Sequence, residues 1–360
     1  MNLSQILTTI AWVCSLIMTL YMGYFFLVSV FGVKKAREYP KAAPKTRFAI
    51  LVAARNEEAV IGNLVESLVH QDYPRELYDV IVIPNNCTDD TAGAVLRAGG
   101  TVLECTVPVR SKGEVLTFAV DTLLEGDKQY DDVLVFDADN VVHPRFLQEM
   151  NNAVCAGARV AQGYRDSKNP RDTLTSGASS IYYWMVDRFY SQARSNMGLN
   201  AVVNGSGFLV DLELLRERGG WHTVTMTEDI EFTAQCALEG NLVYWVPQAV
   251  TFDEQPLTFG ETWKQRKRWS TGMLQCLEHY AGDLFRAGIK GNFRPLDSLI
   301  FFIFPVMQLI WMVSLGLGFA FSVMNIEYGF FPQTNIYYQM FFTLNLSFLG
   351  TFFTALLAVA

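Results

Sequence analysis

The chain has 360 residues, of which 51% are hydrophobic and 18% are charged, and its formal net charge is −8. Residues 1–33 hold no Asp, Glu, Lys or Arg and residues 298–360 hold only Glu327, so 63 of the 64 charged residues lie in residues 34–297. This division excludes a disordered chain, a small disulfide scaffold and a wholly soluble protein, and the net charge argues against nucleic acid as a partner. It predicts a soluble domain held between membrane segments.

Three apolar runs predict transmembrane helices, at residues 1–33, 298–324 and 336–360. Each run is long enough to cross the hydrocarbon of a bilayer, for which about 20 residues suffice. Buried core helices are the alternative for each run. A secretory signal peptide is disfavoured for the first run because no basic segment precedes it. Since the chain stops inside the third run, we expect either a truncated sequence or further helices.

Basic residues flank the soluble region on both sides. Residues 34–47 hold six Lys or Arg, and Arg286, Lys290 and Arg294 precede the second apolar run. The positive-inside rule therefore predicts that residues 34–297 are cytoplasmic in an integral plasma membrane protein. Within this region we expect a basic linker at 34–47, a folded domain at 48–275 and an amphipathic segment at 276–297 that lies on the membrane surface.

In the soluble region, short apolar runs alternate with segments of helical periodicity. The predicted strands are 48–53, 78–83, 100–103 and 132–136, and the predicted helices are 57–70, 89–97 and 114–124. A strand-like segment at 202–210, a helix at 227–238 and a strand at 242–246 follow. This alternation is typical of α/β domains with a mostly parallel sheet, whose ligands bind beyond the carboxyl ends of the strands. No G-x-G-x-x-G or Walker A loop follows a strand, which argues against dinucleotide and P-loop nucleotide binding.

A pair of aspartates directly follows the last of these four strands. Asp137 and Asp139 are two residues apart, and in an extended segment such residues point to the same side. Two carboxylates at a strand end are suited to Mg²⁺ or Mn²⁺, with substrate phosphates as the other ligands. A solvated acidic turn is the alternative.

Two later segments carry further candidate residues. Thr227-Glu228-Asp229 begins a predicted helix, so it is either a simple capping pattern or a site where Asp229 takes a proton from a hydroxyl. Gln265 to Trp269 reads Q-R-K-R-W, in which Arg268 can pair with a diphosphate and Trp269 can stack on a sugar face. The alternative for this segment is a basic patch next to the membrane.

Six segments occur in order: A-R-N-E-E, N-N-C-T-D-D, S-K-G-E, D-A-D, T-E-D and Q-R-K-R-W. Together they make the chain resemble the family 2 glycosyltransferases of the GT-A fold, and especially the membrane-embedded processive synthases of cellulose, hyaluronan, chitin and poly-N-acetylglucosamine. The resemblance covers residues 45–275 and extends to the flanking apolar runs.

The resemblance implies roles for individual residues. Asp137 and Asp139 bind the nucleotide diphosphate and its metal, and Asp229, next to Glu228, is the general base of the T-E-D motif. The donor and acceptor contacts that it implies are Glu57, Asn85, Asp89, Lys112, Gln265, Arg268 and Trp269. Asn85 stands where the family usually has an aspartate that contacts the base, so recognition of the nucleobase is expected to differ there. The segment 204–207, N-G-S-G, takes the place of the loop that lines the acceptor.

The implied activity is inverting, processive polymerisation of a β-linked polysaccharide from UDP-glucose or UDP-N-acetylglucosamine, with passage of the chain across the membrane. The implied partners are the UDP-sugar donor, the growing polysaccharide, the lipid bilayer and a second copy or an accessory secretion subunit. Two alternatives remain open. One is a non-processive transferase that adds a single sugar to a lipid phosphate carrier, and the other is a non-catalytic membrane scaffold.

Overall fold

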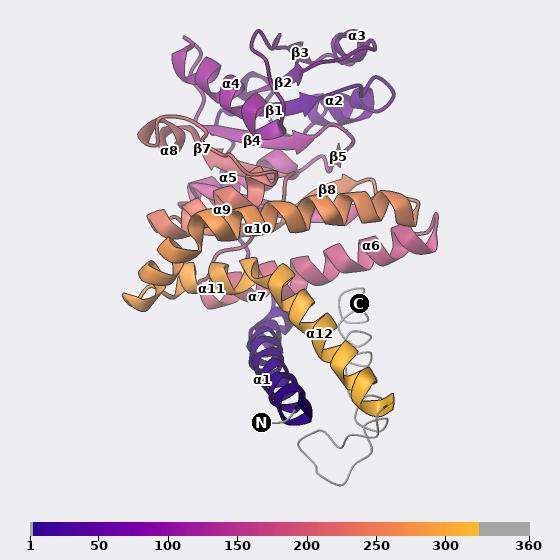
Figure 1. Ribbon diagram of the computed structural model, residues 1–360. Helices are drawn as coiled ribbons and strands as arrows, with labels where there is room; N and C mark the ends of the chain where they lie inside the picture. Colours follow the sequence, from indigo (N-terminus) through magenta and orange to yellow (C-terminus); the bar gives the residue numbers. More distant parts are fainter. Residues whose placement is uncertain (1–2, 324–360) are drawn as a thin grey trace.

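The computed structural model describes residues 3–323 of the chain (Figure 1). Its centre is one eight-stranded sheet with the strand order β3-β2-β1-β4-β7-β6-β8-β5. The third apolar run, 336–360, lies outside the described residues.

The first four strands in chain order are those predicted from the sequence. They are β1 (Phe48–Ala54), β2 (Tyr78–Pro84), β3 (Thr101–Val102) and β4 (Asp132–Asp137), and each pairs in parallel with its neighbour in the sheet. Phe48 of β1 is in register with Tyr78 of β2 and with Asp132 of β4, so the carboxyl ends of these strands lie at one edge. The polar segments that follow the strands are thereby brought to the same side.

The second half of the sheet contains both parallel and antiparallel pairs. β7 (Phe208–Asp211) is antiparallel to both β4 and β6 (Val160–Ser167), whereas β6 pairs in parallel with β8 (Val243–Asp253). The short β5 (Val141–Val142) is antiparallel to β8 at the edge. The sheet is therefore mixed.

Hydrophobic cores cover both faces of the sheet, because successive side chains along a strand point to opposite faces. On one face, Phe48, Ile50 and Val52 pack with α2 (Ile61–Val69), α3 (Thr91–Arg97) and α5 (Phe146–Cys155). On the other face, Ala49 and Leu51 pack with α4 (Lys112–Glu125), α8 (Leu212–Glu217) and α9 (Glu228–Glu239). Strands that are covered on both faces are nearly continuous apolar runs, as β1 is.

Longer helices lie between the sheet and the N-terminal helix (Figure 1). They are α6 (Leu174–Met185), which continues through the π-helix η3 (Val186–Gln192) into α7 (Ala193–Met197), and α10 (Phe259–Ile289). Because α10 is continuous, the predicted boundary at 275/276 between the domain and the surface segment falls inside one helix. α11 (Phe293–Phe302) and α12 (Phe304–Val323) follow, and α1 (Leu3–Ser29), prolonged by η1 (Val30–Val33), lies beside α12.

Two parts of the described chain meet the length and composition of a membrane span. One is the helix over Gln5–Val33, and the other is the pair of helices over 293–314, which is bent by 49° at the break between α11 and α12. The side chains of Leu20 and Phe26 on α1 and of Met312 on α12 are more than 60% exposed. These helices thus present apolar surface on the side away from the sheet.

A buried ion pair joins these helices to the domain. Arg194 of α7 donates two hydrogen bonds of 3.0 and 3.1 Å to the carboxylate of Asp297 on α11, and both side chains are almost completely buried. The hydroxyl of Tyr24 on α1 also donates to Asp297. The Arg194 guanidinium lies 3.5 Å from the centre of the Tyr190 ring. Three helices from distant parts of the sequence are held at this point.

Candidate active site

A cavity of about 420 Å³ lies at the carboxyl edge of the first strands. Asp137 reaches it from the end of β4, Lys112 from the start of α4 and Asp229 from the first turn of α9. The predicted residues that line it are Lys112, Asp137, Glu228, Asp229, Gln265, Arg268 and Trp269. Segments separated by more than 150 residues of sequence therefore meet in one place.

A partly buried network of opposite charges connects the first strands to α9. The Lys112 ammonium donates to Asp137 at 2.5 Å and to the Gly205 carbonyl at 2.5 Å, and it lies 3.7 Å from Glu228. Burial favours a lower pKa for Lys112, but the carboxylates of Asp137, Glu228 and Asp229 raise it overall. Burial likewise favours a higher pKa for Asp137, but Lys112 and Arg165 lower it overall. Both partners are therefore charged at neutral pH.

Asp229 differs from Asp137 in its protonation. Burial, followed by the neighbouring charge of Glu228, raises the pKa of Asp229 to about 7, although the Ile230 N–H donates to it at 2.8 Å. A carboxyl group that titrates near neutral pH can take a proton from a hydroxyl and release it again. Thr227 occupies the N-cap position of α9, but its side chain makes no capping hydrogen bond. The simple capping alternative for this segment therefore loses its main support.

Gly205 separates the two aspartates. It has φ +87°, and a Cβ at this position would lie 3.1 Å from Oδ2 of Asp229 and 3.8 Å from Oδ2 of Asp137. The two carboxylates thus flank the same point in the cavity. Glycine is favoured there because its backbone is left-handed and because a Cβ would crowd the carboxylate of Asp229.

Asp139 makes no ion pair among residues 3–323, and it does not line the cavity. Burial, Asp137 and Asp253 raise its pKa to about 7. Its carboxylate accepts a hydrogen bond of 3.2 Å from the Asn140 amide. Lys112 is the one cation bonded to Asp137 among the described residues, while Asp137, Asp139 and Asp253 repel one another. A further positive charge beside Asp137 would reduce this repulsion, so the residues present fit a divalent cation.

The described residues supply only part of such a metal site. No group of three or more His, Cys, Asp or Glu side chains that could hold a metal ion occurs among residues 3–323. Mg²⁺ usually keeps waters and is completed by substrate phosphates. Asp137, which lines the cavity, and the neighbouring Asp139, which does not, are therefore the carboxylates that would hold a metal arriving with a phosphorylated ligand.

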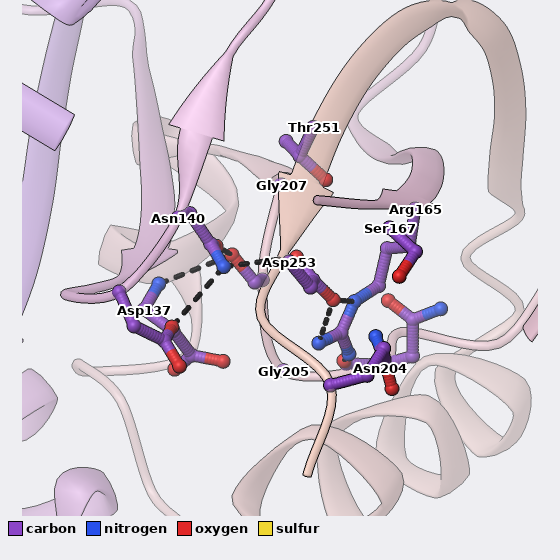
Figure 2. Close-up of polar contacts among 12 residues, drawn as sticks. Asp137, Asn140, Arg165, Ser167, Asn204, Gly205, Gly207, Thr251 and Asp253 are labelled. Atoms are coloured by element: carbon purple, nitrogen blue, oxygen red, sulfur yellow. Dashed lines mark hydrogen bonds and ion pairs between the residues drawn. The ribbon is translucent and has the colours of Figure 1, made fainter. Parts of the chain in front are cut away.

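The floor of the cavity is held by residues that the motifs did not identify (Figure 2). Arg165 of β6 donates to the carboxylate of Asp253 at the end of β8 and to the Asn204 carbonyl, and its guanidinium lies 4.8 Å from the centre of the Tyr183 ring. Asn140 donates to Asp253 at 2.9 Å. Nothing in the local sequence around Arg165 or Asp253 marks them, because their importance comes from the pairing of β6 with β8.

Ser206 connects this network to the predicted metal-binding segment. The Asp137 N–H donates to the Ser206 hydroxyl at 3.1 Å, and that hydroxyl donates to Asn140. The glycine-rich segment at 204–207 is thereby tied to β4. The sequence indicated this segment as part of the site, but its strand begins only at Phe208 rather than at 202.

Three predicted donor contacts lie outside the cavity. Asn85 uses its side-chain amide to donate to the Ala54 carbonyl at 3.0 Å, and Asp89 accepts from the Glu58 N–H at 3.1 Å and from the Thr91 hydroxyl at 2.5 Å. Burial and the charges of Asp137 and Asp89 raise the pKa of Glu57. Asn85 and Asp89 thus shape the loops after β1 and β2, and Asp137 is near enough to Glu57 to raise the pKa of Glu57.

Gln265, Arg268 and Trp269 share one face of α10, because residues three and four apart in a helix are neighbours. The Trp269 ring is stacked with Tyr182 at 6.4 Å between centroids and meets Tyr183 edge-on at 6.2 Å. Aromatic rings at the wall of a polar cavity form a surface on which a sugar ring can lie. The cavity therefore combines an ionised carboxylate, a titratable carboxyl group, cations and an aromatic wall.

Residues 44–272 match the family model described as "Glycosyltransferase like family 2". The β-monoglucosyldiacylglycerol synthase of Nostoc sp. (strain PCC 7120) is 28% identical over 301 residues, which cover 79% of this chain and 61% of that protein. The poly-β-1,6-N-acetyl-D-glucosamine synthase of Staphylococcus epidermidis is 25% identical over 239 residues, covering 64% of this chain and 55% of that protein. The chain thus spans about three-fifths of the length of these relatives.

Among solved structures, the mannosyltransferase PcManGT from Pyrobaculum calidifontis, in complex with GDP-mannose and Mn²⁺, superposes with a TM-score of 0.69. The two sequences are 19% identical, and the alignment covers 98% of this chain and 97% of that one. The similarity establishes the GT-A fold.

Proposed function

Because the chain belongs to glycosyltransferase-like family 2, we propose that it transfers a sugar from a UDP-sugar to an acceptor hydroxyl, with inversion at the anomeric carbon. The observation that carries the proposal is the shared cavity of Asp137, Lys112, Asp229 and Arg268. Cations and metal-binding carboxylates are what a nucleotide diphosphate requires, and a buried carboxyl group of pKa about 7 is what an acceptor hydroxyl requires.

In this reaction Asp229 accepts the proton of the acceptor hydroxyl. The oxygen forms a bond to the anomeric carbon from the face opposite the diphosphate, the bond between that carbon and the diphosphate oxygen breaks, and UDP leaves. Arg268 and Lys112 stabilise the charge that develops on the diphosphate. Asp137 and Asp139 would hold Mg²⁺ or Mn²⁺, which supplies further positive charge to the phosphates when bound.

The proposed product is a β-linked polysaccharide built processively, as the sequence motifs imply. The position of Trp269 at the cavity wall supports this proposal, because an aromatic ring there can hold the end of a growing chain. The similarity to a poly-N-acetylglucosamine synthase supports it as well. Passage of the polymer across the bilayer, together with a second copy or an accessory subunit, is part of the same proposal.

A second candidate is the transfer of a single sugar to a membrane lipid. The similarity to a glucosyldiacylglycerol synthase favours it, and so does an apolar cavity next to the active site. Under either proposal, α1 and the bent pair α11 and α12 anchor the protein in the plasma membrane with its sheet domain in the cytoplasm. The basic residues at 34–47 support this orientation.

A donor screen tests the proposed function. The full chain, purified in nanodiscs with Mg²⁺ or Mn²⁺, is incubated with UDP-glucose, UDP-N-acetylglucosamine or GDP-mannose, and nucleotide diphosphate release is measured. We expect release from one UDP-sugar that depends on the metal. Release from GDP-mannose alone would contradict the choice of nucleotide, and no release from any donor would support a non-catalytic scaffold. The length of the product, determined by mass spectrometry, separates a polymer from a single transferred sugar.

A further inference from the structure

Arg165 reaches the active-site cavity from β6 and lies outside every motif of the sequence. Its side chain is 10% exposed, and its guanidinium is divided between two partners. Nε and Nη2 contact the carboxylate of Asp253, and Nη1 donates to the Asn204 carbonyl (Figure 2). We propose that Arg165 is a positioning residue of the transfer reaction: it fixes the peptide between Asn204 and Gly205, which lies between the metal-binding carboxylate and the base. The inference rests on the proposed function, since it concerns the geometry of that reaction.

The peptide between Asn204 and Gly205 is held by cations at two consecutive carbonyl groups. Arg165 donates to the Asn204 carbonyl, and the Lys112 ammonium donates to the Gly205 carbonyl at 2.5 Å. A Cβ on Gly205 would lie 3.9 Å from Nη1 of Arg165 and 3.1 Å from the Asp229 carboxylate. Because glycine has little intrinsic preference among backbone conformations, contacts from other residues must select this one. The two hydrogen bonds supply that selection beside the base.

Asp253 connects the same guanidinium to the segment that carries Asp137. It accepts a hydrogen bond of 2.9 Å from the Asn140 amide, and the Asn140 side-chain oxygen accepts from the Ser206 hydroxyl. That hydroxyl accepts from the Asp137 N–H at 3.1 Å. Arg165 therefore contacts the base side of the site through one carbonyl, whereas it reaches the metal side only through a chain of further side chains. Loss of Arg165 should affect the base side first.

The orientation of the guanidinium is also fixed from the side. Its carbon lies 4.8 Å from the centre of the Tyr183 ring, and Tyr183 meets Trp269 edge-on at 6.2 Å. The alternative to positioning is that Arg165 only balances the buried charge of Asp253. A buried ion pair by itself is weak evidence for stability, because the loss of hydration offsets the attraction between the charges. The two roles differ in what happens when both charges are removed.

The first experiment compares two arginines on the same segment. Arg159, just before β6, pairs with Asp211 at 3.0 Å, but its side chain is 41% exposed and does not line the cavity. The full chain in nanodiscs is supplied with Mn²⁺ and the donor identified by the screen, and Arg165→Met is compared with Arg159→Met. We expect Arg165→Met to lower kcat by roughly 10–100-fold, as displaced reacting groups typically do, and to change the donor KM by less than about twofold. Arg159→Met should change neither.

The outcomes of this comparison separate the inference from the proposed function. Equal kcat in the two methionine variants would overturn the inference and leave the proposed function intact. A rise in the donor KM of Arg165→Met with unchanged kcat would also overturn it, because Arg165 would then act on the donor. If the unmodified protein released no nucleotide diphosphate from any donor, the proposed function would fail, and the inference with it.

A double variant separates positioning from charge balance. Arg165→Met leaves Asp253 buried without its counterion, so the midpoint of thermal unfolding should fall. Adding Asp253→Asn removes the second charge and keeps an oxygen for the Asn140 amide. We expect the double variant to recover most of the unfolding midpoint and to retain the low kcat, because methionine cannot donate to the Asn204 carbonyl. Recovery of kcat together with the midpoint would overturn the inference.

Arg165→Lys tests whether positive charge alone suffices. The ammonium keeps the charge beside Asp253 but lacks the planar fork with which arginine reaches two partners at once. We therefore expect the kcat of Arg165→Lys to stay close to that of Arg165→Met. A kcat equal to that of the unmodified protein would show that the charge, and not the contact with the Asn204 carbonyl, is what the reaction needs, and would overturn the inference.

Discussion

At the scale of single residues, the pKa values of Asp229 and Asp137 are shifted in opposite directions. Lys112 keeps Asp137 ionised, whereas burial and Glu228 make Asp229 retain its proton up to about pH 7. Two titratable groups whose environments separate their pKa values usually have different roles in a reaction. The motifs indicated both residues, but the difference between them depends on burial, which the sequence does not show.

The first prediction concerns Asp229→Asn. The amide keeps the size of the side chain but cannot take a proton at neutral pH, so we expect turnover to fall by about 10²–10⁴-fold while UDP affinity changes less than about twofold. UDP release and calorimetric binding of UDP measure the two quantities. Asp283→Asn is the control, because Asp283 lies on the exposed side of α10 in an ion pair with Arg286. A parallel loss of UDP affinity would show that Asp229 binds the metal or supports the fold instead.

The second prediction concerns pH. Since the pKa of Asp229 is raised to about 7, the ionised fraction of this base increases as the pH rises through that value, and kcat/KM should rise with it. The same shift implies that ionisation of Asp229 destabilises the fold, because the folded state binds more protons than the unfolded state between about pH 4 and pH 7. Asp229→Asn should therefore be more stable than the unmodified protein at pH 8. A profile of kcat/KM that is flat from pH 5.5 to 8.5 would contradict the role of Asp229.

The third prediction compares two glycines with positive φ. Gly205 has φ +87° beside Asp229, and Gly198 has φ +73° with nothing within 4 Å of an added Cβ. Alanine at either position should cost about 1–2 kcal/mol of stability, because both backbones are left-handed. We expect at least a tenfold loss of turnover in Gly205→Ala alone, measured by UDP release alongside thermal unfolding. Equal activity of the two variants would show that the space between the aspartates is not required.

At the scale of elements, α10 fixes the distance between two predicted motifs. Gly272 of α10 lies against Thr227, where an added Cβ would be 2.3 Å from the threonine Oγ1. This close approach holds Arg268 and Trp269 beside the first turn of α9. One glycine outside the motifs therefore permits the close packing of α10 on α9, which hydrogen bonds from Tyr280 and to Gln275 also hold.

The fourth prediction follows from this contact. Gly272→Ala should destabilise the protein by about 1–3 kcal/mol through overpacking and should lower turnover, since α10 must move away from α9. Gly260→Ala on the same helix has nothing within 4 Å of the added Cβ and should leave turnover unchanged. Thermal unfolding and UDP release are measured for both. If Gly272→Ala retained full turnover, the contact between α9 and α10 would not position the site.

Element by element, the sequence predicts what is local and misses what depends on pairing. β1, β2 and β4 match their predicted ranges within one residue because each is a continuous apolar run. The first helix begins at Ile61 rather than at 57, after Asn56 adopts a left-handed conformation with φ 58°. β6 and α5 were not predicted at all. β6 contains the polar residues Gln162, Arg165 and Asp166, so its sequence does not look like a buried strand. In the structure, a hydrogen bond of Gln162 and the ion pair of Arg165 with Asp253 satisfy these polar groups inside the domain.

At the scale of the whole molecule, the pair Arg194 and Asp297 links the sheet domain to the apolar helices. Both side chains are almost fully buried, and Tyr24 of α1 completes the contact. The sequence does not indicate this pair, because its pattern places Asp297 at the edge of a surface segment. Its burial arises from the way α7, α11 and α1 pack together.

The fifth prediction concerns Asp297→Asn. Loss of one partner leaves the Arg194 guanidinium buried without its counterion, which typically costs about 3–5 kcal/mol. The matched exposed variant, Asp283→Asn, removes an ion pair with 57% of the aspartate side chain exposed and should change stability by less than about 1 kcal/mol. Unfolding in the same detergent measures both. Similar stabilities of the two variants would show that the buried pair does not join the helices to the domain.

The mixed sheet also has a consequence for synthesis of the chain on the ribosome. β1 to β4 are synthesised first and can pair with one another at once. One edge of β4 stays unpaired until β7 has been synthesised, because residues 138–207 must be translated in between. Unpaired strand edges of this kind are sites of aggregation in nascent proteins. By that stage α1 has already left the ribosome, so under the proposed membrane anchoring the half-finished sheet is tethered at the bilayer rather than free among other nascent chains.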